Sequence, residues 1–205
     1  WGIPQCHSYF YLALLQQRWP QARKLLVLCG AGNNAGDGYV LARLALEAGL
    51  QADVRALIEP ARLSGDALRA YDDFARAGGR VGQWGDTFGG ADVAVDAMLG
   101  TGLSRAVDGE FAAAIARLNR SGLPVLALDI PSGLSADTGA GSGAVKADAT
   151  ITFIANKIGL HTADAPLYVG DLWFAGLGIS ADLQIGVVPV AKRMAAPVLP
   201  QRSPV

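Results

Sequence analysis

The sequence has little of what would tie it to nucleic acid or to a membrane. Only 17% of its 205 residues are charged and the formal net charge is −1, so we expect no basic surface for DNA or RNA. The apolar runs at residues 24–29 and 124–130 have the length of strands, far short of the roughly 20 residues that a membrane-spanning helix needs. We therefore predict neither a nucleic-acid partner nor a membrane-spanning segment.

Cysteine and histidine are scarce as well. The two cysteines, Cys6 and Cys29, provide no disulfide framework, and His7 and His161 have no partners at metal-ligand spacing. Zinc chemistry is therefore disfavoured, and so is triad hydrolysis, because no nucleophile elbow is present. A reducing compartment is the default for such a chain, and we expect a cytoplasmic protein. Cys29, at the end of an apolar run, is expected in the core.

The chain ends suggest a piece of a longer protein. The first residue is not Met, and the last seven are Leu-Pro-Gln-Arg-Ser-Pro-Val. The apolar stretch at 6–15 has no basic region before it and no small-residue cleavage site after it, so we do not expect a signal peptide.

What the sequence does have is a regular alternation of strand-like and helix-like segments. With 51% hydrophobic residues, a chain of this length can bury one substantial core. Strands that alternate with helices favour a largely parallel sheet with helices on both faces. We predict a three-layer, Rossmann-like α/β domain over residues 1–190 and a tail or linker over 191–205. The strands are expected at 25–29, 52–58, 80–83, 92–99, 124–130, 149–155 and 171–175, and the helices at 9–18, 39–49, 60–77 and 111–119.

Three polar, glycine-bearing segments follow buried strands directly, at 30–38, 96–102 and 129–133. The carboxyl ends of neighbouring parallel strands meet at one edge of a sheet, where α/β proteins bind ligands. We therefore expect an active-site rim. It should contain Asn33, Asn34, Asp37, Asp96, Thr101, Asp129 and Ser132.

The first of these segments opens a helix, so its N–H groups favour a phosphate or another anion. Its glycines could instead serve only a tight turn and close packing. The side-chain oxygens of Asn33, Asn34 and Asp37 argue against a pure turn, because a hard cation or a sugar would use them.

Asp96 and Asp129 each close an apolar strand, where an ionised carboxylate is costly unless it meets a cation, a donor or water. Asp129 is a candidate general acid or base, with the capping of a turn as an equally weighted alternative. For Asp96 we favour a cation-binding or structural role.

Other polar side chains near the rim allow two interpretations each. Thr101, Ser104 and Arg105 could hold a phosphate or could form a solvated loop, with equal weight. Lys146 and Lys157 flank the strand at 149–155, where solvation is the more frequent role of a lysine.

Four motifs in order resemble the YjeF N-terminal domain family, the NAD(P)H-hydrate epimerases. They are Gly-Ala-Gly-Asn-Asn-Ala-Gly-Asp-Gly (30–38), Asp-Ala-Met-Leu-Gly-Thr-Gly (96–102), Asp-Ile-Pro-Ser-Gly-Leu (129–134), and Ala-Thr-Ile-Thr-Phe (149–153) with Lys-Ile-Gly-Leu (157–160). The resemblance covers roughly residues 20–180. It departs from the family pattern at residues 1–15, which lack the expected helix motif, and at Ala31 and Ala35, where proline and glycine are frequent.

The resemblance implies a non-redox reaction that interconverts the R and S forms of hydrated NADH or NADPH at carbon 6. It implies Asp129 as the proton-transferring residue and a potassium ion as the cofactor, held by Asn34, Asp96 and Ser132. It further implies a small-molecule substrate, a dehydratase domain fused after this one, and it leaves a homodimer open. The implied substrate-binding residues are Asn33, Asn34, Ala35, Gly36, Asp37, Gly100, Thr101, Gly102, Leu103, Ser104, Arg105, Ala106 and Asp129.

Two other functions compete with this one. An ordinary NAD(P)-dependent oxidoreductase would use the first glycine-rich segment as a dinucleotide fingerprint. However, no Tyr-x-x-x-Lys pair exists, and only Glu59 could serve as the acidic residue after the second strand. A non-catalytic sensing or partner-binding module of the same fold is the second alternative, because fold alone does not fix function.

Overall fold

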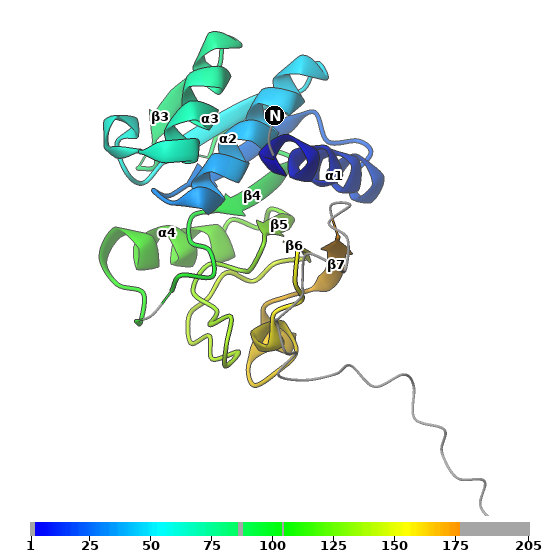
Figure 1. The fold of residues 1–205 in the computed structure, drawn as a ribbon, viewed down its shortest axis with the longest axis vertical. Helices are drawn as coiled ribbons and strands as arrows, with labels where there is room; N and C mark the ends of the chain where they lie inside the picture. Colours follow the sequence, from blue (N-terminus) through cyan, green and yellow to red (C-terminus); the bar gives the residue numbers. More distant parts are fainter. Residues whose placement is uncertain (1–2, 86–87, 104, 177–205) are drawn as a thin grey trace, which may run out of the picture.

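Seven parallel strands form one sheet in the order β3-β2-β1-β4-β5-β6-β7 in the computed structural model, which describes residues 3–85, 88–103 and 105–176 (Figure 1). The predicted three-layer α/β fold is confirmed. The sheet is parallel throughout, since every neighbouring pair of strands runs in the same direction. The strands are β1 (Lys24–Cys29), β2 (Gln51–Ala56), β3 (Val81–Gln83), β4 (Val93–Ala97), β5 (Val125–Leu128), β6 (Ala149–Phe153) and β7 (Asp171–Ala175).

Helices cover the two faces of the sheet unequally. The helices α1 (Ile3–Arg18), α2 (Asn33–Glu47) and α3 (Gly65–Arg76) lie on one face, whereas α4 (Gly109–Asn119) lies on the other (Figure 1). Successive side chains of a strand point to opposite faces. Accordingly, Val27 of β1 joins the core under α1–α3, and its neighbour Leu28 joins the core under α4. Short 3-10 turns at Pro60–Arg62, Ile158–Leu160 and Ala165–Leu167 complete the elements.

The helix after β1 begins six residues earlier than the sequence predicts. The expected start was residue 39, but α2 begins at Asn33, so most of the glycine-rich segment forms the first turns of a helix. The glycine content had suggested a loop, because glycine disfavours helix. Tertiary packing overrides that preference. The end of the helix matches the prediction, because Gly49 follows it with a φ of 80°.

Glycines 30 and 38 are needed for close approach. A Cβ on Gly30 would lie 1.9 Å from the carbonyl oxygen of Met98, and one on Gly38 would lie 2.6 Å from the Cβ of Ala97. No other residue fits at these distances. Gly30 therefore lets the chain after β1 touch the chain after β4, and Gly38 brings α2 down onto the sheet.

The order in which strands are added to the sheet reverses between β1 and β4. β1 pairs with β2 on one side and with β4 on the other. The helix that follows β1 covers one face, and the helix that follows β4 covers the other. The segments after these strands diverge as a result, and this is where an open α/β sheet forms a ligand crevice.

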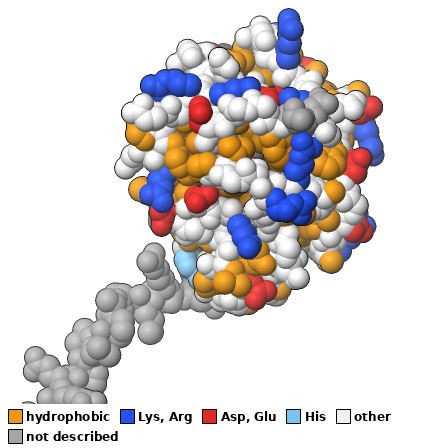
Figure 2. All heavy atoms as spheres, turned by 180° about the vertical axis from the view of Figure 1, so that it is seen from behind, with side chains coloured by type: hydrophobic (Ala, Val, Ile, Leu, Met, Phe, Trp, Pro, Cys, Tyr) orange, Lys and Arg blue, Asp and Glu red, His pale blue; other side chains and the backbone are white. Residues whose placement is uncertain are grey.

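Two further features concern the charges on the surface and the length of the helices. The face seen in Figure 2 carries both Lys or Arg and Asp or Glu side chains, with hydrophobic side chains between them. Among the helices that the structure describes, none has the length and apolarity to cross a membrane. The predicted boundary at residue 190 and the tail at 191–205 lie outside the described residues.

Candidate active site

A cavity of about 570 Å³ opens where the chain leaves β1, β4 and β5. The three segments predicted to form a rim therefore meet as expected. Nine of the thirteen residues implied as substrate-binding line this cavity. They are Asn33, Asn34, Asp37, Gly100, Thr101, Gly102, Leu103, Arg105 and Asp129, and Ala31, Gly32, Met98, Leu99 and Phe111 line it with them.

Ala35, Gly36 and Ala106 do not line this first cavity, although Gly36 lines a second cavity that adjoins it. The side chain of Ala35 is fully buried in the core under α1–α3, and Ala106 does not line the cavity. Gly36 packs α2 against α3, since an added Cβ would lie 3.1 Å from the Cα of Ala67. Ser104 lies outside the described residues. Because the Ala35 side chain is buried in the core, this residue can contact a ligand only through its backbone N–H group in the first turn of α2.

Of the predicted ion-binding residues, Asn34 lines this cavity. Asp96 and Ser132 do not line it, but they form hydrogen bonds with the backbone of Met98 and Leu99 in its wall. The Asp96 carboxylate is fully buried and accepts hydrogen bonds from the Ser132 N–H at 2.7 Å and the Ser132 hydroxyl at 2.6 Å. The Met98 N–H donates to it as well, at 3.2 Å. Burial raises the pKa of Asp96 to about 6, and these three hydrogen bonds offset part of the rise.

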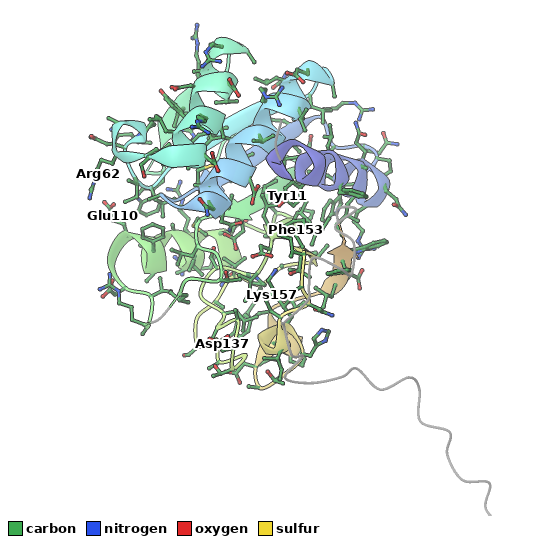
Figure 3. All side chains as sticks on the ribbon, in the orientation of Figure 1. Tyr11, Arg62, Glu110, Asp137, Phe153 and Lys157 are labelled. Carbon is green, nitrogen blue, oxygen red and sulfur yellow. The ribbon has the colours of Figure 1, made fainter. Side chains whose placement is uncertain are left out.

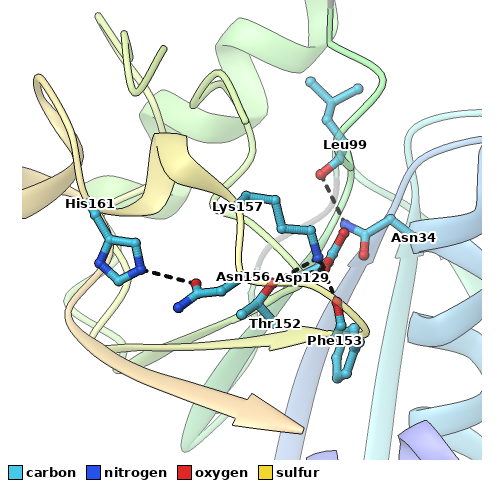
Figure 4. A network of polar contacts seen from close by, with 8 residues as sticks. All are labelled: Asn34, Leu99, Asp129, Thr152, Phe153, Asn156, Lys157 and His161. Carbon is cyan, nitrogen blue, oxygen red and sulfur yellow. Dashed lines mark hydrogen bonds and ion pairs between the residues drawn. The ribbon is translucent and has the colours of Figure 1, made fainter. Parts of the chain in front are cut away.

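The backbone of Leu99 joins Asn34 to this group. Its carbonyl oxygen accepts from Asn34 Nδ2 at 2.9 Å (Figure 4), and its N–H donates to Ser132 Oγ at 2.8 Å. Asn34 Oδ1, on the other side of the same amide, is buried and has no hydrogen-bond partner among the described residues. A buried carbonyl oxygen without a donor is costly, so this atom is suited to a ligand from outside the chain.

The chemistry of these donors fits a hard cation. The group formed by Asn34, Asp96, Ser132 and the Leu99 carbonyl offers amide, hydroxyl, carbonyl and carboxylate oxygens, and hard cations prefer oxygen ligands. Within the described residues, no group of three or more His, Cys, Asp or Glu side chains could hold a metal ion. The site is therefore chemically unlike a zinc or iron site, and its largely neutral oxygens suit a cation of low charge.

Asp129 stands at the end of β5 and forms an ion pair with Lys157 (Figure 4). The two side chains are only 19% and 17% exposed. Lys157 Nζ also donates to Thr152 Oγ1 at 2.8 Å and to the Phe153 carbonyl at 3.0 Å, so its position is fixed. This arrangement holds the Asp129 carboxylate and the Lys157 ammonium against each other at the wall of the cavity.

The backbone at Asp129 is strained, and so is that at Ile154, which follows β6. Their φ angles are 65° and 61°. Each lies at the centre of a tight turn, because the N–H of the next residue donates to the carbonyl of the previous one, at 2.8 Å around Asp129 and 2.6 Å around Ile154. Such γ-turns with positive φ are rare. Strain of this kind gathers at functional sites, and here it turns the Asp129 carboxyl toward the cavity.

Asp37 is the second carboxyl of the cavity wall. Burial raises its pKa to about 7, the charge of Asp129 adds to the rise, and Tyr11 opposes it. The Tyr11 hydroxyl is buried and approaches Asp37 without forming a regular hydrogen bond. Its ring packs edge-on against Phe153 with the centroids 4.7 Å apart, and Figure 3 shows Tyr11, Phe153 and Lys157 in one region.

A second cavity of about 680 Å³ adjoins the first. The two share Asn33, Asp37, Thr101 and Asp129 in their walls. The far wall of the second cavity comes from α3 and from the turn after β6, and includes Asp66, Ala67, Ala70, Phe153, Ile154, Ala155 and Lys157. Together the cavities form one long site with Asp37 and Asp129 at its middle.

Sequence reasoning missed three parts of this site. The contribution of Tyr11 could not be seen, because residues 1–15 depart from the family pattern, and the α3 wall carries no motif. Lys157 was a weak candidate on its own, although its place in the fourth motif was a usable signal. Lys146, weighed equally, is exposed, and Cys29 is fully buried as expected.

Comparison with known proteins settles the ancestry of the chain. The family model described as YjeF-related protein N-terminus matches residues 8–159. The chain belongs to this family. The resemblance of the four motifs is thereby confirmed, and the site described above lies within the matched residues.

Several curated members of the YjeF-related family are similar to this chain. A "Bifunctional NAD(P)H-hydrate repair enzyme Nnr" of Coxiella burnetii is 45% identical over 81% of this chain and 34% of the relative. The protein of the same name from Escherichia coli is 44% identical over 80% of this chain and 32% of its own length. An "NAD(P)H-hydrate epimerase" of Limosilactobacillus fermentum is 39% identical over 74% of each chain. The chain thus spans about a third of the length of the first two relatives.

A solved structure supports the YjeF-related fold. Yeast ynu0 matches with a TM-score of 0.74 and 16% sequence identity, covering 94% of this chain and 86% of the yeast chain. At this identity the likeness concerns the fold alone.

Proposed function

We propose that this chain is an NAD(P)H-hydrate epimerase, an isomerase that interconverts the R and S forms of hydrated NADH and NADPH without redox chemistry. The observation that carries the proposal is the meeting of three motifs at one cavity, with an ion-paired Asp129 beside the first turn of α2. The similarity to a separate "NAD(P)H-hydrate epimerase" over 74% of each chain supports it.

The first cavity suits the diphosphate and ribose of a dinucleotide. The first N–H groups of α2 have no partners within the helix and attract anions. The exposed Thr101 and Arg105 lie across from them, and a guanidinium can bind a phosphate through two hydrogen bonds. Asn33 and Asp37 supply acceptors and donors for hydroxyl groups.

Asp129 is the residue that would carry the chemistry. Loss of the hydroxyl from carbon 6 leaves a positive charge on the ring, and the Asp129 carboxylate can stabilise it electrostatically. The same carboxylate can transfer the proton that accompanies loss and return of the hydroxyl. The ion pair with Lys157 holds the carboxylate in place.

Asn34, Asp96 and Ser132 would hold the potassium ion, together with the Leu99 carbonyl. The unpartnered Asn34 Oδ1 supports this assignment. A bound cation would offset the buried charge of Asp96 and fix the chain after β4. The residues themselves already order this segment, since Ser132 binds both Asp96 and Leu99.

The proposal extends to the context of the domain. Two of the relatives are named bifunctional and are about three times as long as the matched segment. An epimerase that supplies one isomer to a dehydratase specific for S, fused or separate, accounts for that name.

The decisive experiment is exchange between the purified R and S forms of hydrated NADPH, followed by chromatography that separates them, with potassium present and after its replacement. Potassium-dependent exchange supports both the activity and the ion. Binding without exchange would favour a sensing or partner-binding module, and hydride transfer from ordinary NADPH would favour an oxidoreductase.

A further inference from the structure

The two cavities meet at a pair of carboxyl groups in unlike surroundings. Asp129 faces an ammonium group, whereas Asp37 faces the hydroxyl of Tyr11 and the charge of Asp129. Both line both cavities. Two carboxyl groups in such unlike surroundings can divide the roles of acid and base between them.

We propose that Asp37 is a second catalytic residue, the general acid that protonates the departing hydroxyl, while Asp129 is the base for the entering water, with the reacting ring bound where the two cavities meet. This inference rests on the proposed epimerase function and assigns Asp37 a role beyond ligand binding. Inversion at carbon 6 requires departure from one face of the ring and addition at the other, so one carboxyl for each event suits the reaction.

The charged groups around Asp37 support its role as the acid. Asp129 repels a second negative charge, and Lys157 is engaged by Asp129, Thr152 and Phe153. Asp66, on α3, lines the second cavity and pairs with Arg69. With a pKa of about 7, much of Asp37 holds a proton at neutral pH.

The proposed steps balance without any oxidant or reductant. The C6–O bond breaks with its electron pair going to oxygen, the Asp37 carboxyl gives that oxygen its proton, and water leaves a cationic ring. A water then forms a new C6–O bond at the opposite face, and Asp129 takes the proton that this oxygen loses. The proton then passes back from Asp129 to Asp37 through water, which restores both groups for the next turnover.

Tyr11 is a positioning residue in this scheme. It is fully buried, and its hydroxyl has no regular hydrogen-bond partner. It lowers the pKa of Asp37 from the value that burial alone would give. Removal of the hydroxyl should therefore raise that pKa further and extend the acid form to higher pH.

The test is the pH profile of kcat/KM for epimer exchange in the full chain and its variants. The wild type should lose activity as pH rises above about 7. Asp37→Asn should be slower by about 10²–10⁴-fold, should lack this alkaline limb and should bind hydrated NADPH within a few-fold of the wild type. Tyr11→Phe should keep its rate at low pH, with the limb moved to higher pH. Asp137→Asn, an exposed aspartate away from the site (Figure 3), is the control.

Near-normal exchange with an unchanged limb in Asp37→Asn would overturn the inference. If that variant does not fold, an unmoved limb in Tyr11→Phe overturns it instead, since that variant loses only the hydroxyl that approaches Asp37. A wild type that binds but never exchanges would refute the proposed function itself, and with it the role of Asp37. If the wild type exchanges the two forms and Asp37→Asn exchanges them equally fast, only the role of Asp37 is refuted and the proposed function stands.

Discussion

Two neighbouring strands, β4 and β5, end in carboxyl groups that are stabilised in opposite ways. Asp96, the penultimate residue of β4, is fully buried and is surrounded by neutral donors from Ser132 and Met98. Asp129 after β5 is partly open to the cavity and is paired with the ammonium of Lys157. No ion pair reaches Asp96 from the part of the chain that the structure describes.

Asp96 thus has an environment suited to a cation from outside the chain, whereas Asp129 already has the ammonium group of Lys157 as its cation. A buried carboxylate that lacks a cationic side chain keeps part of its charge uncompensated, and the unpartnered Asn34 Oδ1 beside it offers one more oxygen ligand. Asp129 needs no external cation, so its charge remains available to a substrate. One sheet edge thus carries two neighbouring carboxylates, one buried among neutral donors and one paired with an ammonium group.

The largest expected effect is at Asp129. Asp129→Asn should reduce the rate of epimer exchange by about 10²–10⁴-fold, because the amide neither accepts the proton nor stabilises the cationic ring. Binding of hydrated NADPH, measured by calorimetry, should change by only a few-fold. Asp137→Asn is the matched control, and near-normal turnover in Asp129→Asn would remove the proposed contrast between the two carboxylates.

Two substitutions of Lys157 test whether its charge matters for the reaction. Lys157→Met should reduce exchange by about 10–100-fold, the range expected when a charge-assisted hydrogen bond is lost, whereas Lys157→Arg should recover part of the rate. Lys146→Met, at an exposed lysine, is the control. Equal rates for the Met and Arg variants would show that the charge beside Asp129 is unimportant.

The Asp96 side of the comparison is tested by Ser132→Ala. This change removes one donor to Asp96 and the acceptor of the Leu99 N–H. The free energy of unfolding, measured by urea denaturation, should fall by about 1–3 kcal/mol, the cost of leaving buried polar groups unpaired. The exposed Ser142→Ala should leave it unchanged, and similar values for the two variants would argue against a structural role for Ser132.

The smallest expected effect concerns the ion. Potassium chloride should raise the midpoint of thermal unfolding of the wild type by a few degrees relative to choline chloride at equal ionic strength, because a ligand that binds the folded state stabilises it. Asn34→Ala should lose most of this difference. An identical response in the two proteins would mean that Asn34 does not hold the cation.

The fold was accessible from the sequence because its signals are local. Strands such as the buried one at 25–29 and the more exposed one at 171–175 are short apolar or alternating runs, and their predicted bounds match the structure within a residue or two. The start of α2 was not accessible. Its glycines predict a loop, and the contact of Gly38 with Ala97 that selects the helix joins distant segments.

The candidate site was predictable only where its residues follow strands. Asn34, Asp37, Asp96 and Asp129 lie in motifs at strand ends, so one topological rule brings them together. Tyr11 belongs to a helix at the start of the chain, and the pairing of Lys157 with Asp129 depends on a γ-turn. Such geometry depends on long-range packing, which no local pattern shows. The potassium ion, the homodimer and the cytoplasmic location stay predictions.

The central place of β1 also has a consequence for how the protein folds. Leu25 of β1 pairs with Val93 of β4, far along the chain, whereas β2 is a near neighbour. Contacts between distant residues form slowly, because the loop between them must close first. The unit formed by β1, α2 and β2 can therefore assemble early during synthesis. The cavity between the motifs can form only after β4, which carries Asp96, and β5, which precedes Asp129, have been made and have docked in turn.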